Sequence, residues 1–237
     1  MSLLTMVKIG VIALLLTLEL IIFYGVNIAL AYPFRGLIHL MMAYWYYSER
    51  KAILNQIDKL FLVSCLIPAI TPIPIYIFGF TWGTLLEVAL LLVSYQLLIR
   101  IYFLEGARIR ITGKKQLNTF FRAVIPYVCL PLTYFFLVVF PLTKPDVFIV
   151  TFIYLVQIMY MALLSAYLPF PEKSKLLISL GMFFILFASG ASVHRVYVVP
   201  YFFDYGFVRI AAVLGRILII AGLLNRINQE GLISKSA

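Results

Sequence analysis

The sequence predicts an all-α protein, a polytopic transmembrane helical bundle of about eight transmembrane helices with both termini in the cytoplasm. Of its 237 residues, 64% are hydrophobic and 12% are charged, whereas a soluble domain is nearer half apolar and a quarter charged. A chain of this length cannot bury such an excess in its own core. The apolar residues also form runs of about 20, the length that crosses the hydrocarbon of a bilayer.

Eight apolar segments follow one another along the chain, and short linkers join them, so we expect a single domain over residues 1–237. The first is too long for a signal peptide, whose apolar region has about 7–15 residues. The second is short but ends in an aromatic belt, Tyr44–Tyr47, which is typical of a membrane interface. The predicted segments are 8–31, 34–47, 60–78, 81–103, 117–140, 147–168, 176–199 and 207–225.

The basic residues predict the orientation, because short loops rich in Lys and Arg face the cytoplasm. Eight crossings keep the basic loops together, whereas removal of the second segment separates Lys8 from the later ones. The net charge of +10 then reflects orientation and attraction to anionic headgroups, and we expect no nucleic-acid partner. The cytoplasmic set is Lys8, Arg50, Lys51, Lys59, Arg108, Arg110, Lys114, Lys115, Lys173, Lys175, Arg226 and Lys235; the opposite side has Arg35, Lys144, Arg195 and Arg209.

Polar residues inside the predicted spans are the candidate site, because a charge at the bilayer centre costs at least about 2.5–3.5 kcal/mol. We expect Glu19 or Glu87 to meet Arg216 or His194, either as a structural ion pair or in a pocket. A cationic pocket suits an anionic headgroup, which arginine binds well. The catalytic residues are unknown, with Glu19, Glu87 and His194 as candidates; the binding candidates are Arg35, His39, Gln96, Gln157, Arg209 and Arg216.

The sequence patterns of metal sites, nucleotide binding, serine or metal-dependent hydrolysis and retinal binding do not occur. Cys65 and Cys129 are far apart and in no metal-ligand spacing, so we expect neither a metal site nor a cofactor. No phosphate-binding loop, nucleophile elbow or H-E-x-x-H pattern occurs. The last segment contains no lysine that could hold retinal, because its cations are arginines.

Four stretches of the sequence resemble helices of a known family in order and pattern. They are Tyr32–Leu37, Gly83–Glu87, Gly181–Gly190 and Leu214–Ile219. They are similar to the second, fourth, seventh and eighth helices of the YhhN family, the lysoplasmalogenase-like membrane proteins. The resemblance implies an eight-helix fold and hydrolysis of an ether lipid. The acids of that family at the end of its third helix and in its seventh have no counterpart near residues 67–71 or at Ser189-Gly190.

Several functions are therefore compatible with the sequence. The first is a YhhN-like membrane protein that binds a lipid or lysolipid in an intramembrane polar pocket without catalysis. The alternatives are an ether-lipid hydrolase of the lysoplasmalogenase type, a non-catalytic subunit or sensor of a membrane complex, and a small transporter. The expected partners are membrane lipids and other membrane proteins, and the expected location is the cell membrane, inner or plasma.

Overall fold

The structure, a computed structural model, describes residues 3–51, 54–109, 113–143 and 145–233. In these residues all the regular secondary structure is helical. Seven helical segments within these ranges are long and apolar enough to cross a membrane. Arg110, Lys144 and Lys235, which entered the orientation argument, lie outside the described residues. The helices form two compact units, Met1–Ile101 and Tyr102–Ala237. The prediction of a single domain stays a prediction.

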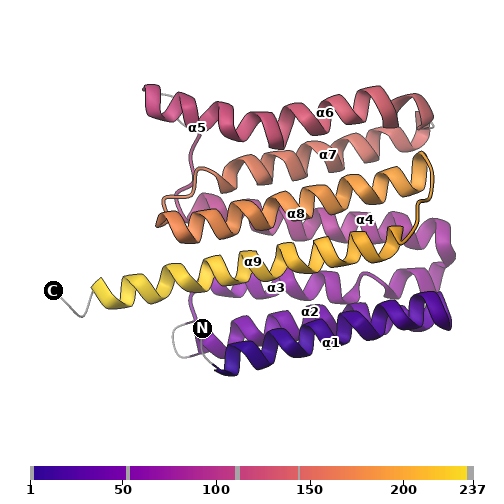
Figure 1. Cartoon of the computed structure of the whole chain (residues 1–237), viewed down its shortest axis with the longest axis horizontal. Helices are drawn as coiled ribbons and strands as arrows, with labels where there is room; N and C mark the ends of the chain where they lie inside the picture. Colours follow the sequence, from indigo (N-terminus) through magenta and orange to yellow (C-terminus); the bar gives the residue numbers. More distant parts are fainter. Residues whose placement is uncertain (1–2, 52–53, 110–112, 144, 234–237) are drawn as a thin grey trace. The chain divides into compact units, whose positions relative to one another are not determined.

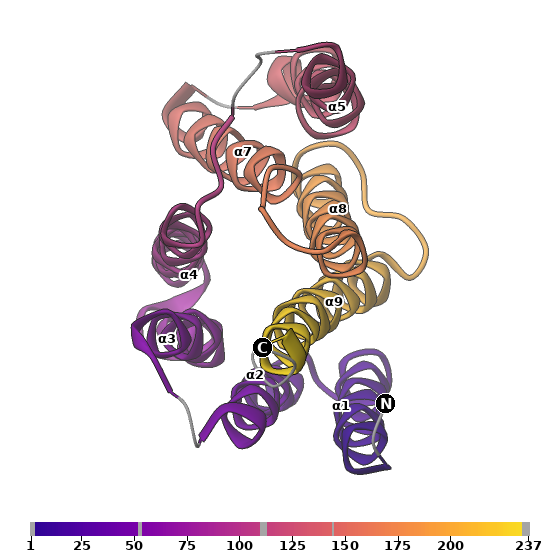
Figure 2. The same ribbon diagram turned by 90° about the vertical axis from the view of Figure 1, so that its left-hand side faces the viewer.

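The first unit begins with an antiparallel helix pair, α1 (Leu3–Gly25) and α2 (Ile28–Arg50), which lie side by side in Figures 1 and 2. The turn between them is tight because the Asn27 side chain caps α2, accepting a hydrogen bond of 2.8 Å from the Ala29 N–H. At the other end of the pair, Lys8 Nζ lies 2.8 Å from Glu49 Oε1. Because the turn comes at residues 26 and 27, α1 ends six residues before the predicted limit, and residues 29–31 belong to the next helix.

The second predicted segment is longer than its apolar run suggests. α2 has 23 residues, where the sequence predicted 34–47, and at 1.5 Å per residue it is about 34 Å long. It is not among the seven apolar candidates, because polar residues interrupt it: Arg35, His39, Ser48, Glu49 and Arg50. Its length matches that of α1, and the Lys8–Glu49 pair joins their ends.

The third and fourth spans match the prediction closely. α3 (Gln56–Ile70) and α4 (Ile73–Leu104) together provide the apolar segments Gln56–Gly79 and Leu85–Leu104. The chain bends sharply at Gly79, whose φ of 72° is readily available only to glycine. Gly83 then lies so close to the backbone of Ile75 that a Cβ atom there would be 2.4 Å from the Ile75 Cα.

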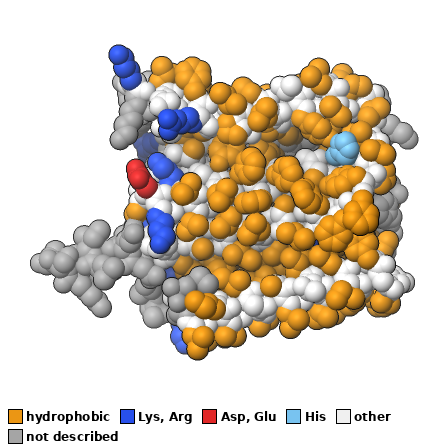
Figure 3. Space-filling view, in the orientation of Figure 1, with side chains coloured by type: hydrophobic (Ala, Val, Ile, Leu, Met, Phe, Trp, Pro, Cys, Tyr) orange, Lys and Arg blue, Asp and Glu red, His pale blue; other side chains and the backbone are white. Residues whose placement is uncertain are grey.

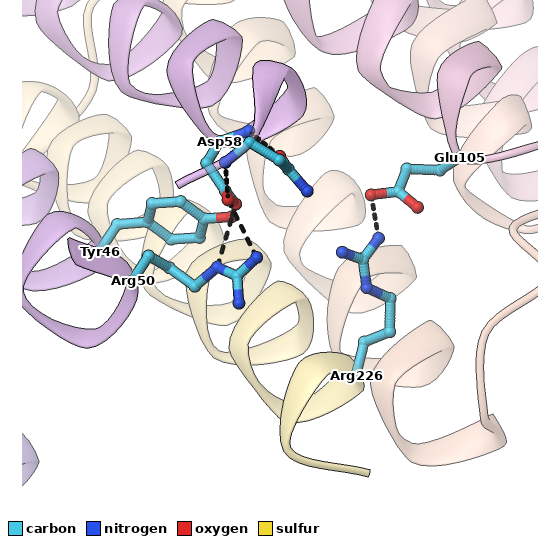
Figure 4. A network of polar contacts seen from close by, with 6 residues as sticks. Tyr46, Arg50, Asp58, Glu105 and Arg226 are labelled. Atoms are coloured by element: carbon cyan, nitrogen blue, oxygen red, sulfur yellow. Dashed lines mark hydrogen bonds and ion pairs between the residues drawn. The ribbon is translucent and has the colours of Figure 1, made fainter. Parts of the chain in front are cut away.

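A buried ion pair fixes the start of α3 against the end of α2 (Figure 4). The Arg50 guanidinium contacts both carboxylate oxygens of Asp58, at 3.1 and 2.9 Å, and the Tyr46 hydroxyl donates to Asp58 Oδ1 at 2.7 Å. Asp58 also forms a capping box with Asn55. Such a fork uses the planar geometry that distinguishes arginine from lysine, and it satisfies a carboxylate that is fully buried.

The second unit contains α5, α7, α8 and α9, with an irregular helix after α5 (Figure 1). In Figure 2, α7 lies beside α8, and α8 lies beside α9. The apolar segments Gln116–Leu142, Phe148–Ser165, Glu172–Tyr197 and Asp204–Arg226 agree with the last four predicted spans. The helices are α5 (Lys114–Val124), α6 (Leu130–Tyr134), α7 (Pro145–Ser165), α8 (Glu172–Tyr197) and α9 (Asp204–Ile233).

The irregular helix contains two π-helical turns, η2 (Ile125–Cys129) and η3 (Phe135–Val139), on either side of α6, and ends in the 3₁₀ turn η4 (Phe140–Leu142). Pro126 and Pro131 explain the departure from α-helix at η2, because a proline offers no N–H to the carbonyl four residues earlier. Single π-helical turns inside α-helices are frequent at functional sites.

α8 and α9 approach each other through glycine. A Cβ on Gly181 would lie 2.6 Å from the Gly215 carbonyl oxygen, and one on Gly215 would lie 2.7 Å from that of Gly181. The isoleucine four residues after each glycine, Ile185 or Ile219, packs over the glycine of the other helix. Small residues at a crossing let two backbones come close, which is how helices associate where lipid removes the hydrophobic driving force.

The surface of the second unit separates charge from apolar side chains. On the face that Figure 3 shows, hydrophobic side chains cover the helices along their length, and Lys and Arg side chains gather at the end where α5 begins. Near that end, Arg226 is ion-paired with Glu105 (Figure 4) and its guanidinium lies 4.8 Å from the centre of the Phe170 ring. This distribution is the one that positive-inside charge bias predicts.

We predict that Gly215→Ala lowers the thermal stability of the detergent-solubilised protein, because the new methyl group forces α9 away from α8. Overpacking of this kind costs about 1–3 kcal/mol. The measurement is the midpoint of thermal unfolding, followed by tryptophan fluorescence or by loss of monodispersity. Gly10→Ala in α1 is the matched control, because no atom lies within 4 Å of a Cβ at Gly10. Equal midpoints for the two variants would contradict the glycine contact.

Candidate functional site

Most polar candidates of the first unit are ion-paired inside the unit or buried in it. Glu87 forms an ion pair with Arg35, which connects α4 to α2. Glu19 is fully buried on α1, and His39 is buried on α2, whereas Gln96 is exposed on α4. Glu87 and Arg35 were both among the candidate site residues of the sequence analysis. In the structure they contact each other, and this contact is an ion pair between two helices.

The polar candidates of the second unit lie on three helices. Gln157 on α7 is buried, as are Arg209 and Arg216 on α9. His194, three residues before the end of α8, has its Nδ1 atom 2.6 Å from the Tyr134 hydroxyl of α6. The expected meeting of Glu19 or Glu87 with Arg216 or His194 stays a prediction, as does a common pocket formed by these residues.

The structure places a hydrophobic pocket of about 530 Å³ within the second unit, around His194. Its walls come from the irregular helix after α5, from α7 and from α8, with Tyr201 and Phe207 near the α8–α9 connection. The apolar lining includes large side chains from each helix, such as Leu130, Phe135, Ile158, Leu186 and Phe187. Ligand pockets typically have about 300–1,000 Å³ and are mostly apolar with a few polar groups, which is the composition found here.

Several polar groups of the pocket form hydrogen bonds between helices. Besides the Tyr134–His194 contact, the Tyr154 hydroxyl of α7 lies 3.0 Å from Ser189 Oγ of α8. Thr151 Oγ1 lies 3.3 Å from the hydroxyl of Tyr197. These contacts link α7 and the irregular helix to α8, so the pocket walls are held by hydrogen bonds that gain strength in a surrounding of low dielectric constant.

The irregular helix contributes a large share of the lining, including Pro126, Leu130, Pro131, Tyr134, Phe135 and Val139. A π-helical turn changes the direction in which later side chains project, because it inserts an extra residue into the helical repeat. The prolines of this segment therefore influence which side chains face the pocket. Among these side chains, Tyr134 is the one whose hydroxyl contacts His194.

Sequence reasoning identified His194 but missed the residues around it. These residues are uncharged, so a search for charges that are costly to bury does not detect them. They are Tyr134, Thr151, Tyr154 and Ser189. The available signal was the pair Pro126 and Pro131 within an otherwise apolar segment, since prolines in a transmembrane helix mark irregular backbone that needs other partners.

Comparison of the sequence with protein-family models, with curated proteins and with solved structures gives no match. The resemblance to the YhhN family stays a prediction. Among the described residues, no group of three or more His, Cys, Asp and Glu side chains could hold a metal ion. Cys65 is buried and Cys129 is exposed, and the two do not form a disulfide.

Gly190 provides a test of the space in the pocket. It lines the pocket from the interior of α8, and no atom lies within 4 Å of a Cβ at this position. We predict that Gly190→Ala raises the unfolding midpoint in detergent, because alanine stabilises a helix interior by about 0.5–1 kcal/mol relative to glycine. A lower midpoint than that of the unmodified protein would show that the position is not open.

Proposed function

We propose that this multi-pass membrane protein binds a single-chain lipid, with the chain held in the hydrophobic pocket of the second unit. The observation that carries the proposal is the pocket itself, about 530 Å³ of mainly apolar lining that includes a Tyr134–His194 pair. Apart from Tyr201, the lining belongs to segments that are long and apolar enough to cross a membrane. A molecule that enters such a site comes from the bilayer.

The same lining favours binding over hydrolysis of an ether lipid. Hydrolysis by general acid and base needs a proton donor and a group that activates water. No Asp or Glu lies among the residues that line the pocket, all of which are within the described ranges, and its one imidazole, His194, is hydrogen-bonded to Tyr134. The proposed role is therefore that of a lipid-binding protein without hydrolytic activity.

The proposal includes eight crossings, with α2 as the eighth and both termini in the cytoplasm. Two features of the first unit support it. α1 and α2 have the same length, 23 residues each. Their far ends are joined by the Lys8 contacts to Ser48 and Glu49. A helix that returns beside a membrane-spanning partner over the same length ends on the side where that partner began.

Photolabelling with an octadecyl diazirine tests the binding proposal. We predict that the probe modifies pocket residues of α6, α7 and α8 in the protein in native membranes. Gly190→Leu, which fills the pocket from α8, should lower this labelling about tenfold, equivalent to about 1.4 kcal/mol of binding free energy. The measurement is the extent of modification of each peptide by mass spectrometry after ultraviolet irradiation.

Gly10→Leu is the matched control, because Gly10 also has open space around it but lies on α1, in the first unit. In Gly10→Leu, the probe should modify the pocket peptides to the same extent as in the unmodified protein. Uniform modification of all apolar helices, or equal labelling in Gly190→Leu, would contradict the proposal. The proposal would also be contradicted if a copurifying protein prevented the probe from modifying the pocket residues, because the pocket would then be occupied by a helix of that partner.

Single-cysteine labelling tests the eighth crossing. In a background with Cys65 and Cys129 replaced by alanine, Val26→Cys places a thiol in the α1–α2 turn and Lys51→Cys places one after α2. We predict that a membrane-impermeant maleimide modifies position 26 in intact cells and position 51 only after permeabilisation. Modification of both positions under the same condition would mean that α2 does not cross.

A further inference from the structure

We propose that the lipid bound in this pocket has an uncharged polar head, a hydroxyl or a carbonyl, and that His194 with Tyr134 recognises it. This inference rests on the proposed function, because it names the class of lipid that the same pocket selects. The polar side chains of the lining are all uncharged or, in the case of histidine, able to be neutral: Tyr134, Thr151, Tyr154, Ser189, His194 and Tyr201.

A charged head lacks a counter-ion in the lining. No Lys, Arg, Asp or Glu belongs to it, within ranges that the structure describes throughout. A phosphate would thus lose its hydration without the arginine or lysine contacts that recognise phosphate in proteins. Transfer of an unpaired charge into an apolar site is far more costly than transfer of a hydroxyl that forms a hydrogen bond.

The nearest cation along the chain is already occupied. Arg195 follows His194 on α8, and its Nε atom lies 3.0 Å from Asp204 Oδ2. The same guanidinium lies 5.6 Å from the centre of the Tyr205 ring. Its charge is balanced by the carboxylate, so it offers little attraction to an anion in the pocket.

His194 can present either hydrogen-bonding role to a ligand. Its Nδ1 atom is engaged with the Tyr134 hydroxyl, at 2.6 Å. If tyrosine donates this hydrogen bond, a neutral imidazole carries its proton on Nε2 and can donate to a ligand oxygen; in the other tautomer Nε2 accepts. A ligand hydroxyl is compatible with both tautomers, and a carbonyl oxygen is compatible with the first.

The geometry divides the pocket into two parts with different roles. The aliphatic and aromatic lining of α6, α7 and α8 holds the chain, and its selectivity is for length and shape. The imidazole near the end of α8 and the hydroxyl of Tyr134 select the head by hydrogen bonding. Lipids that share a chain should therefore be distinguished by head charge.

Competition for the octadecyl diazirine label tests the inference in the full-length protein. The competitors share an 18-carbon chain: 1-monooleoylglycerol, oleoyl lysophosphatidic acid and 1-octadecene. We expect monooleoylglycerol to halve pocket labelling at a concentration at least about tenfold below that of the other two. His194→Phe and Tyr134→Phe should reduce its advantage over octadecene, while octadecene itself competes as before.

Tyr160→Phe is the matched control for Tyr134→Phe, because Tyr160 lies on the exposed side of α7 and is not in the lining; it should leave the order of competitors unchanged. Equal or better competition by lysophosphatidic acid would overturn the uncharged-head inference and leave chain binding intact. Failure of every competitor, with labelling spread over all helices, would overturn the proposed function instead.

Discussion

The absence of water from the bilayer interior is the constraint on which this structure depends. Hydrocarbon offers no partner to a backbone N–H or to a charge, so backbone groups must be satisfied within helices. The described part of the chain follows that rule, being helical apart from connections and terminal turns. Where prolines remove backbone donors, at Pro126 and Pro131, the helix adopts a wider turn, η2.

The two units meet this constraint in different ways. In the first unit, several charged residues are neutralised in pairs: Arg50–Asp58 is the most buried of these pairs, and Arg35–Glu87 connects α2 with α4. In the second unit, α8 and α9 associate through close backbone contact at Gly181 and Gly215. This contact fixes α8, and α8 carries His194 and Ser189 to the pocket. Helix packing therefore determines the site.

A pocket in such a bundle is unlike a site in a soluble enzyme, because its surroundings already favour apolar ligands. Selectivity must then come from the few polar atoms, and here those atoms are hydroxyls and one imidazole. The ionisable residues that attract attention in a membrane sequence, such as Glu87 and Arg35, serve as contacts between helices. This half-buried pair connects α2 with α4, and a contact between helices is therefore the role that the structure shows for it.

The sequence by itself determined the membrane class and most of the spans. Apolar runs of membrane-spanning length predicted six of the seven apolar segments to within a few residues, and the first to within about six, because hydrophobicity is a local property of the chain. α2 was predicted too short at both ends. Residues 28–31 had been assigned to the first span, and Ser48, Glu49 and Arg50 end the apolar run before the helix itself ends.

Only the tertiary structure decided which polar groups meet. The sequence identified Arg35, Glu87 and His194 as polar residues inside spans. It contained no information that Glu87 faces Arg35, or that His194 faces Tyr134 across 60 positions of sequence. Such pairings depend on the rotation and spacing of packed helices. These are set by close contacts such as Gly181 with Gly215, which no local pattern of hydrophobicity specifies.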